Sequence, residues 1–195
     1  MPEIKYMKWV EKLAQKLPVF TTRDMTARGV PPSYVRRLGN YLVKEKGVTR
    51  LERGKFTTLT DPLLGASWMV FPSYLSMTTA LHLRGVLLQV PHEIQVITTR
   101  KRKEKKTKVM GADVNFFRVG KKLFFGYTYM EYQSHQLPIA EPEKALVDLA
   151  YFGFEPEGKL MLEKLNMKKL EAYVNMVGSD AVKKRVKRWA NVTME

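Results

Sequence analysis

The N-terminal part of the chain places apolar residues at helical spacing. Over residues 4–17 they recur every three or four positions with lysines between them, which predicts an amphipathic helix. Pro18 ends this pattern, because proline cannot continue a helix. Thr22 then stands in the position of an N-cap, so we expect a second, shorter helix that begins there and closes at Gly29.

A third helix and a hairpin follow. The helix is predicted over residues 33–46, directly after two helix-breaking prolines. Two short runs rich in strand-forming residues, at 48–51 and 55–59, are separated by a turn that contains Gly54, which predicts strand, tight turn, strand. Three short helices followed by a hairpin are the pattern of a winged helix-turn-helix domain, which we place at residues 1–64.

The polar face of the third helix and the turn of the hairpin are the candidate DNA contacts. Val35, Leu38 and Leu42 form the apolar stripe of this helix, so the polar residues lie on its other side. A recognition helix enters the major groove, where arginine and asparagine hydrogen-bond to base edges, while a hairpin suits the adjacent backbone or minor groove. A solvated basic face and a protein-contact role for the winged helix remain open alternatives. The predicted contact residues are Thr22, Ser33, Tyr34, Arg36, Arg37, Asn40, Lys44, Arg50, Arg53 and Lys55.

The rest of the chain mixes helix and strand signals. The turn-rich stretch 60–73 is the predicted boundary before a second domain at 65–195. Pro138 suggests that the strand containing it lies at a sheet edge. The expected fold class is α+β, with the winged helix-turn-helix followed by a mixed α/β domain that ends in helices. In this second domain we expect helices at 74–85, 142–151, 157–177 and 179–190. We expect strands at 94–98, around Val109, and at 114–119, 123–127 and 137–140.

Charge narrows the class of partner. The chain carries 34 Lys and Arg against 19 Asp and Glu, a formal net charge of +15, and residues 1–66 hold 13 basic and 6 acidic side chains. This excess favours a polyanionic partner, with double-stranded DNA first and an anionic membrane surface second. No apolar run approaches the roughly 20 residues that span a bilayer. The N-terminus lacks the layout of a signal peptide, and zero cysteines exclude disulfides and thiolate chemistry, so we expect a cytoplasmic protein without membrane association.

Two further basic segments stand out. Seven of the nine residues at 100–108 are basic, which fits either a solvated hairpin loop or an arm that contacts phosphates. The helix at 179–190 is also strongly basic around an apolar stripe of Val182, Val186 and Trp189. Such a helix can pack on the core, lie on a membrane or meet an acidic partner, and we favour packing, with Trp189 in the interior. The predicted accessory nucleic-acid contacts are Arg100, Lys101, Arg102, Lys103, Lys105 and Lys106.

Catalytic chemistry has few candidates. The three histidines are scattered and have no partners at metal-ligand spacing, and no phosphate-binding glycine loop is present, so we expect no metal, no cofactor and no enzymatic activity. Glu141, Glu143, Lys144 and Asp148 could together serve a metal-dependent nucleic-acid-processing enzyme, and this is the alternative function. The simpler interpretation is that the two glutamates stabilise a helix N-terminus while Lys144 and Asp148 form a surface ion pair.

Several segments of the second domain resemble the core of AbiEi-type antitoxins. The resemblance spans about residues 5–152, keeps the order of the motifs, and is most specific at the helix start Pro142-Glu143-Lys144-Ala145-Leu146. One departure is Glu141, because this family often has the better N-cap Ser or Thr at the position before the proline. The similar segments are Tyr74 to Gly85, Gln89 to Pro91, Ile94 to Thr98, the basic residues 100–108, Phe124 to Tyr127, and Ile139 to Leu149.

The resemblance implies two activities. Members of this family are transcriptional regulators of type IV toxin–antitoxin modules, in which the winged helix binds inverted repeats in its own promoter and represses the operon. The C-terminal domain counters a nucleotidyltransferase-like toxin. The resemblance therefore implies a DNA-binding repressor and antitoxin.

Overall fold

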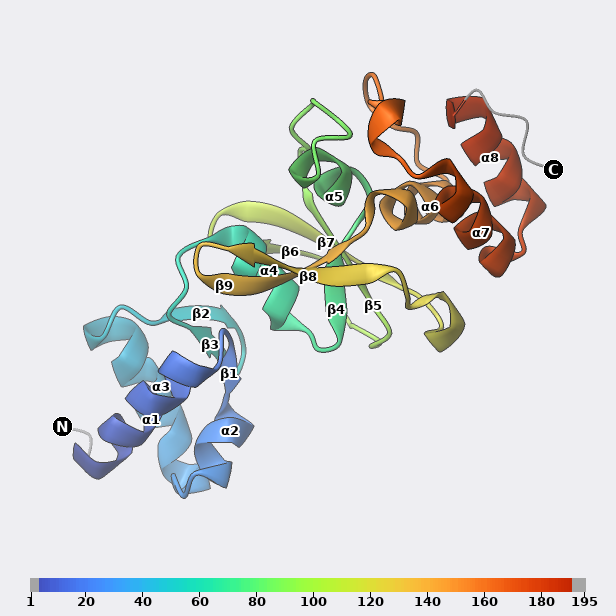
Figure 1. Cartoon of the computed structure of the whole chain (residues 1–195). Helices are drawn as coiled ribbons and strands as arrows, with labels where there is room; N and C mark the ends of the chain where they lie inside the picture. Colours follow the sequence, from blue (N-terminus) through green and yellow to red (C-terminus); the bar gives the residue numbers. More distant parts are fainter. Residues whose placement is uncertain (1–3, 191–195) are drawn as a thin grey trace. The chain divides into compact units, whose positions relative to one another are not determined.

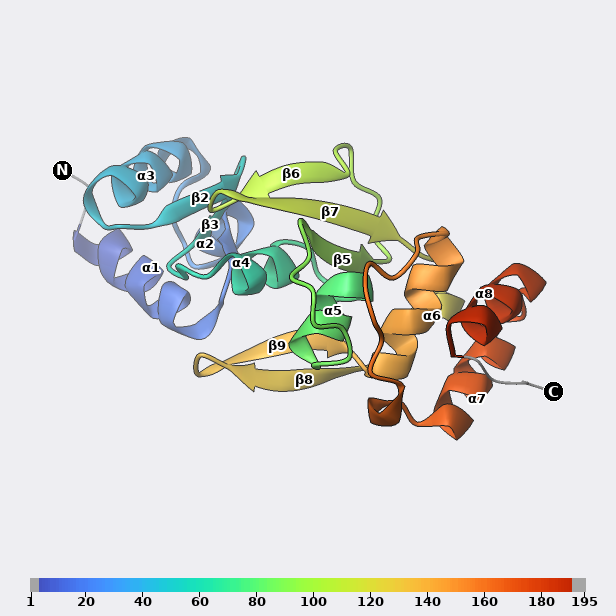
Figure 2. The same ribbon diagram turned by 90° about the horizontal axis from the view of Figure 1, so that it is seen from above.

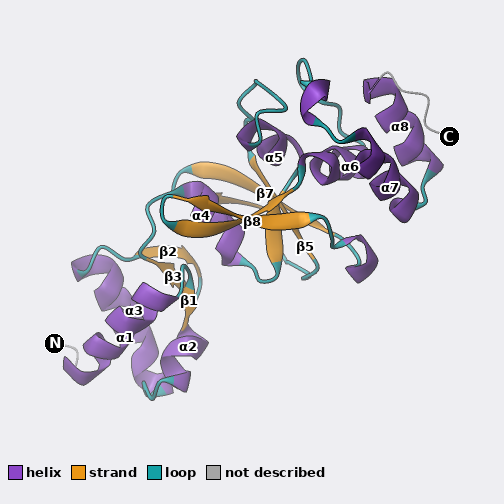
Figure 3. Ribbon diagram, in the orientation of Figure 1, coloured by secondary structure: helices purple, strands orange, loops and turns teal. Residues whose placement is uncertain are grey.

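The computed structural model describes residues 4–190 and has an α+β fold, which confirms the predicted fold class at this level (Figure 1). The chain divides into two compact units. Unit 1 consists of Met1–Met69 together with Lys108–Ala112, and unit 2 consists of Val70–Thr107 together with Asp113–Glu195. Unit 1 contains a three-stranded sheet, and a six-stranded mixed sheet lies mainly in unit 2 (Figure 3).

Unit 1 has the predicted order of three helices and a hairpin. The short strand β1 pairs antiparallel with β3, which gives the sheet order β1-β3-β2, and the sequence pattern did not predict β1. The predicted turn-rich stretch after the hairpin is wrong in part, because it contains the helix α4, whose side chains are mostly apolar and buried. The elements are α1 (Ile4–Lys16), β1 (Phe20–Thr21), α2 (Thr22–Ala27), α3 (Pro32–Glu45), β2 (Thr49–Glu52), β3 (Lys55–Thr57) and α4 (Pro62–Met69).

The start of α2 lies one residue from its prediction. Thr21 is the N-cap, and Thr22, the predicted cap, is the first helical residue. The Thr21 hydroxyl accepts a hydrogen bond from the Asp24 amide at 3.2 Å, and the Asp24 carboxylate accepts one from the Thr21 amide at 2.7 Å. Two neighbouring threonines can both serve as caps, and only Thr21 stands three residues before the acidic partner of a capping box.

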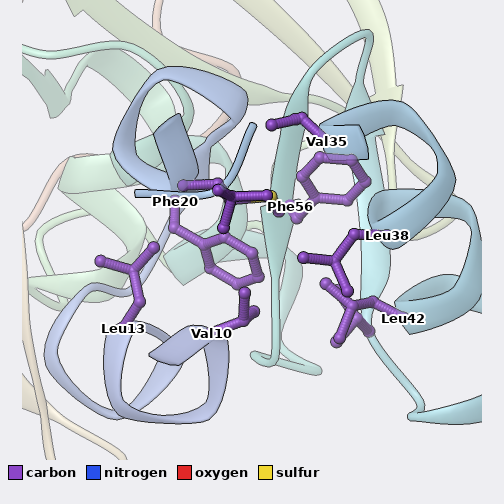
Figure 4. Close-up of a cluster of buried hydrophobic side chains, with 10 residues drawn as sticks. Val10, Leu13, Phe20, Val35, Leu38, Leu42 and Phe56 are labelled. Atoms are coloured by element: carbon purple, nitrogen blue, oxygen red, sulfur yellow. The ribbon is translucent and has the colours of Figure 1, made fainter. Parts of the chain in front are cut away.

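An apolar core joins α1, α2 and α3 to the hairpin (Figure 4). Phe20 of β1 and Phe56 of β3 stack at 5.8 Å between ring centroids, and both are buried. Gly39 in the middle of α3 faces this pair: a Cβ atom there would lie 2.7 Å from Cζ of Phe56. The helix therefore approaches the hairpin more closely than any larger residue at position 39 would allow. The other buried members are Val10, Leu13, Met25, Val30, Val35, Leu38, Leu42 and Val48.

The second sheet has the order β6-β7-β5-β4-β9-β8. β5 runs parallel to β7 and antiparallel to β4, while β4 and β9 are parallel. β8 and β9 form an antiparallel hairpin at the edge. The strands are β4 (Ser73–Leu75), β5 (Ile94–Thr98), β6 (Lys106–Val109), β7 (Ala112–Arg118), β8 (Tyr127–Tyr132) and β9 (His135–Ala140).

Several of the strand and helix predictions for this unit are wrong. The predicted helix 74–85 is the buried strand β4 followed by the shorter α5 (Met77–Leu83), because a three-residue strand is too short to show a period of two. The predicted strand 123–127 is replaced by a 3-10 helix at Lys121–Leu123, and β8 begins only at Tyr127. β9 is not an edge strand. β4 meets it in register at Ile139, and at a parallel bridge the preceding Pro138 need supply only its carbonyl.

Helices α5 (Met77–Leu83) and α6 (Pro142–Phe152) contact strands of this sheet. α6 packs between α5 and the pair α7 (Met167–Val177) and α8 (Asp180–Ala190), as Figure 2 shows. Pro142 is at the predicted first position of α6. The predicted helix 157–177 begins only at α7, after a 3-10 turn at Leu162–Lys164.

The apolar stripe of α8 is buried as predicted at Val182 and Val186 but not at Trp189. Trp189 is half-buried, and its indole N–H donates to the exposed Glu155 carboxylate at 2.7 Å. Among residues 4–190, no helix combines the length and the apolar character needed to cross a membrane.

The contact between Gly39 and Phe56 predicts the effect of one methyl group. Gly39→Ala should lower the free energy of unfolding by about 1–3 kcal/mol, because the added methyl group would overlap the buried Phe56 ring and force the ring or the helix to shift, even though alanine favours a helix by about 1 kcal/mol over glycine. Urea denaturation followed by circular dichroism measures this change. The matched substitution is Gly120→Ala, where the backbone φ is −70° and no atom lies within 4 Å of the added Cβ, so stability should stay within about 0.5 kcal/mol. A Gly39→Ala protein as stable as the wild type would contradict this account of the packing.

Candidate nucleic-acid interface

The outward face of α3 is polar and basic. Val35, Leu38 and Leu42 are buried in the core of unit 1, and this fixes the rotation of the helix about its axis. The remaining polar positions therefore face solvent. The predicted contact residues that are exposed on α3 are Ser33, Arg36, Arg37, Asn40 and Lys44.

A groove lies between α3 and the hairpin of β2 and β3. Three arginines line it, Arg36 from the helix and Arg50 and Arg53 from the hairpin, against a single carboxylate, Glu52. Phe56, the aromatic residue beneath Gly39, also lines it, so the apolar core of unit 1 reaches the groove. The lining residues are Thr22, Pro32, Val35, Arg36, Asn40, Arg50, Leu51, Glu52, Arg53, Gly54 and Phe56.

Arg50 connects the hairpin to the helix. A terminal guanidinium nitrogen of Arg50 donates to the Oδ1 atom of Asn40 at 2.6 Å, and the guanidinium lies 5.5 Å from the centre of the Phe56 ring. The amide oxygen of Asn40 is thus occupied, while its NH₂ group keeps two hydrogens to donate to a ligand. Arg50 was expected to contact the DNA backbone, and in this structure it also positions Asn40.

The tight turn of the hairpin is tied to the start of α2. Gly54 adopts φ +77°, a conformation that favours glycine, and its carbonyl accepts a hydrogen bond from the Thr22 amide at 2.9 Å. A Cβ atom at position 54 would lie only 3.2 Å from the Thr22 hydroxyl. The turn therefore stays close to the helices, and the exposed Arg53 beside Gly54 stands at the groove.

Two of the predicted contact residues lie elsewhere. Tyr34 is half-buried and packs against Tyr6 of α1, with 5.5 Å between ring centroids, so its ring serves the packing of unit 1. The Lys55 ammonium lies 2.6 Å from the Glu52 carboxylate and donates to the Met69 carbonyl at 2.7 Å. Lys55 is not among the residues that line the groove.

The basic residues at 100–108 form the connection between β5 and β6 and the start of β6. Arg100, Lys101, Lys103, Lys105 and Lys106 are exposed, and Arg102 is half-buried. The segment 99–105 has no regular secondary structure, but its side chains make specific contacts with the sheet.

The ion pair of Lys144 and Asp148 on α6 differs from its prediction in one respect. Lys144 and Asp148 do form an ion pair, but it is buried, with side chains 1% and 2% exposed, and not at the surface as expected. The Asp148 carboxylate also accepts hydrogen bonds from Ser76 at 2.7 Å and Tyr74 at 3.2 Å. Burial raises the pKa of Asp148, while Lys144 and the two hydroxyls oppose that rise. The spacing of four residues predicted the pairing but could not show that the rings of Tyr74 and Phe125 would lie 6.0 and 4.6 Å from the Lys144 ammonium.

The two glutamates at the start of α6 are also engaged. Glu143 is buried and accepts a hydrogen bond from the Asn166 amide at 2.7 Å. Glu141 makes no capping hydrogen bond, as expected for glutamate, and accepts one from Lys169 at 2.7 Å and another from Tyr173. Burial would raise the pKa of Glu141, but these hydrogen bonds lower it below its ordinary value.

This arrangement does not bring the carboxylates of α6 to a common point. Each has its own donors, and no group of three or more His, Asp or Glu side chains that could hold a metal ion occurs within residues 4–190. The alternative function, nucleic-acid processing by this cluster, therefore gains no support from the side-chain contacts.

Comparison with known proteins adds a likeness of fold. No family model matches the sequence, and none of the curated proteins matches it. A similar solved structure is the crystal structure of RV2827C protein from Mycobacterium tuberculosis, with a TM-score of 0.58 and 16% sequence identity. The match covers 97% of this chain and 78% of the mycobacterial chain. At this identity the likeness concerns the fold alone.

Proposed function

We propose that this protein is a DNA-binding transcriptional repressor whose unit 1 is a winged helix-turn-helix domain. The observation that carries the proposal is the groove between α3 and the hairpin, where Arg36, Asn40, Arg50 and Arg53 converge beside the exposed face of the helix. In the proposed complex α3 is the recognition helix in the major groove, and the hairpin is the wing.

Base contact and phosphate contact fall to different residues. Asn40 is near the middle of α3 and is held by Arg50, so its NH₂ group is pre-positioned to donate to an acceptor on a base edge. Arg37 and Lys44 lie on the same exposed side of the helix. Arg53 is at the turn, where a cation suits the DNA backbone and gives affinity without sequence preference.

The net charge of the chain supports the same partner. A formal charge of +15 attracts a polyanion over a distance of about 8–10 Å at physiological salt, and this speeds the encounter with DNA. Steering of this kind is independent of sequence. Specificity must therefore come from the few side chains of α3 that reach the bases.

Substitutions at Asn40 and at Arg53 should change the affinity for DNA in different ways. A DNA site is first obtained by selection from random duplexes with the full chain. Asn40→Ala should then weaken binding to this site by about 1–3 kcal/mol and weaken binding to a scrambled duplex less. Arg53→Ala should weaken both alike and lower the slope of log affinity against log salt by about one unit. Fluorescence anisotropy at several salt concentrations measures both effects.

The control for these variants is Lys121→Ala, which removes an exposed charge outside the groove and should leave both affinities near those of the wild type. Equal losses on the two duplexes for Asn40→Ala would mean that Asn40 makes no base contact. A pool from which no sequence is enriched would overturn the assignment of a sequence-specific repressor.

The second part of the proposal is that the protein is an AbiEi-type antitoxin. It rests on the resemblance of residues 5–152 and in particular on the segment Pro142-Glu143-Lys144, which opens α6 in unit 2. The proposed operator is an inverted repeat in the promoter of the protein's own operon. The proposed target of unit 2 is a nucleotidyltransferase-like toxin.

The two activities should be separable in the full chain. Arg36→Ala/Arg37→Ala removes two exposed cations of α3 and should abolish repression of the promoter. The same variant should still restore growth to cells that express a nucleotidyltransferase-like toxin encoded beside this gene, because the proposed antitoxin residues lie in unit 2. Growth rescue that disappears in this variant, with its circular dichroism unchanged, would place the antitoxin activity in the winged helix and contradict the assignment.

A further inference from the structure

A second basic site lies in unit 2 and shares no residue with the groove. A pocket there, which we call the tract pocket, is lined by seven residues, five of them cationic. The others are Phe116 of β7 and Thr98 at the end of β5. The lining residues are Thr98, Arg100, Lys101, Arg102, Lys105, Phe116 and Arg118.

The sheet builds this pocket where two parallel strands end. β5 and β7 are parallel, and Thr98 pairs with Arg118, so their carboxyl ends lie side by side. The buried Thr98 hydroxyl donates to the Pro72 carbonyl at 2.7 Å and accepts from the Arg100 amide at 3.1 Å. These two bonds fix the backbone as it leaves β5, and the cations that follow are held close to the end of the sheet.

The arginines of the pocket are anchored through their Nε atoms. Arg100 donates from Nε to the Phe71 carbonyl at 3.1 Å, and Arg118 donates from Nε to the Thr99 carbonyl at 3.4 Å. The terminal nitrogens of both guanidinium groups remain as donors for a ligand. Arg102 lies over the Phe116 ring at 4.2 Å, and its Nε donates to the Glu104 carbonyl at 3.1 Å. Three guanidinium groups are thus oriented by the fold.

The pocket has five positive side chains and no carboxylate in its lining. Lys101 and Lys105 form no ion pair with any residue in the described part of the chain, whereas the neighbouring Lys106 pairs with Glu93 at 3.4 Å. Like charges held together repel each other, and a bound anion relieves that repulsion. Guanidinium groups with fixed planes are the side chains that best match phosphate oxygens.

From these observations we propose that the tract pocket binds a compact oligophosphate group, such as the triphosphate of a nucleotide. The number of positive charges in the pocket favours an oligophosphate over a DNA duplex as its ligand. A duplex distributes its charge at about one per 1.7 Å of helix axis, and each phosphodiester carries a single charge, so one pocket would meet only one or two of them. A triphosphate brings about four negative charges to one place, which is comparable with the five cations that line the pocket.

The experiment uses the full chain and inorganic tripolyphosphate as the probe, with orthophosphate and ATP for comparison. Isothermal titration calorimetry should show tripolyphosphate binding at least about tenfold tighter than orthophosphate, with ATP close to tripolyphosphate. Lys101→Gln/Lys105→Gln should weaken tripolyphosphate binding by about tenfold or more. Both side chains are exposed and unpaired among the described residues, so the variant keeps its fold. The matched control, Lys121→Gln/Lys122→Gln, removes two exposed lysines outside the pocket and should change the affinity less than about twofold.

Three results would overturn the proposal. Tripolyphosphate could bind no tighter than orthophosphate, or both double variants could weaken its binding equally, and either result would mean that only the general charge of the protein acts. The third result comes from competition in Arg36→Ala/Arg37→Ala, which removes two cations of the α3 face. A random duplex that displaces tripolyphosphate from this variant would make the tract pocket a contact for nucleic-acid backbone.

The experiments distinguish a failure of the oligophosphate proposal from a failure of the proposed DNA-binding function. Loss of oligophosphate binding would leave sequence-specific DNA binding by unit 1 intact. An absence of sequence-specific DNA binding would equally leave the tripolyphosphate titration unchanged, because the two sets of residues do not overlap.

Discussion

The packing of Phe56 beneath Gly39 is the contact on which unit 1 depends. It sets how closely α3 approaches the hairpin, and the same ring stacks on Phe20, which brings β1 and α1 into one core. Phe56 also lines the groove and lies under the guanidinium of Arg50, which holds Asn40. One buried aromatic residue therefore connects the core of the unit to the side chains that we propose contact DNA.

The sequence predicted the helices that have a clear pattern of apolar residues, and it missed the short strands that depend on hydrogen bonds from distant parts of the chain. The amphipathic pattern of α1 and the apolar stripe of α3 gave both helices to within about two residues at each end, the range within which methods of assigning helix ends differ. β1 has two residues and β4 three, and strands this short carry no period that a pattern can show. They exist because their neighbours β3, β5 and β9 supply hydrogen bonds from distant parts of the chain.

The sequence predicted those residues of the candidate site that lie on the exposed face of α3. Helical periodicity alone placed Arg36, Arg37 and Asn40 on the outer face of α3. It could not place Tyr34 against Tyr6, join Arg50 to Asn40, or pair Lys55 with the Met69 carbonyl, since each of these contacts depends on tertiary packing. The same holds for Lys144 and Asp148, whose burial is decided by the strands and aromatic residues that cover α6, and for the basic residues of the tract pocket.

Entry of α3 into the major groove can be tested by methylation interference on the selected duplex. Dimethyl sulfate methylates guanine at N7 in the major groove and adenine at N3 in the minor groove. Duplexes methylated once each are separated by the full chain into bound and free fractions. If α3 lies in the major groove, N7 methylation of guanines within the selected site should exclude a duplex from the bound fraction. Interference confined to adenine N3, with guanine N7 methylation tolerated throughout the site, would contradict it.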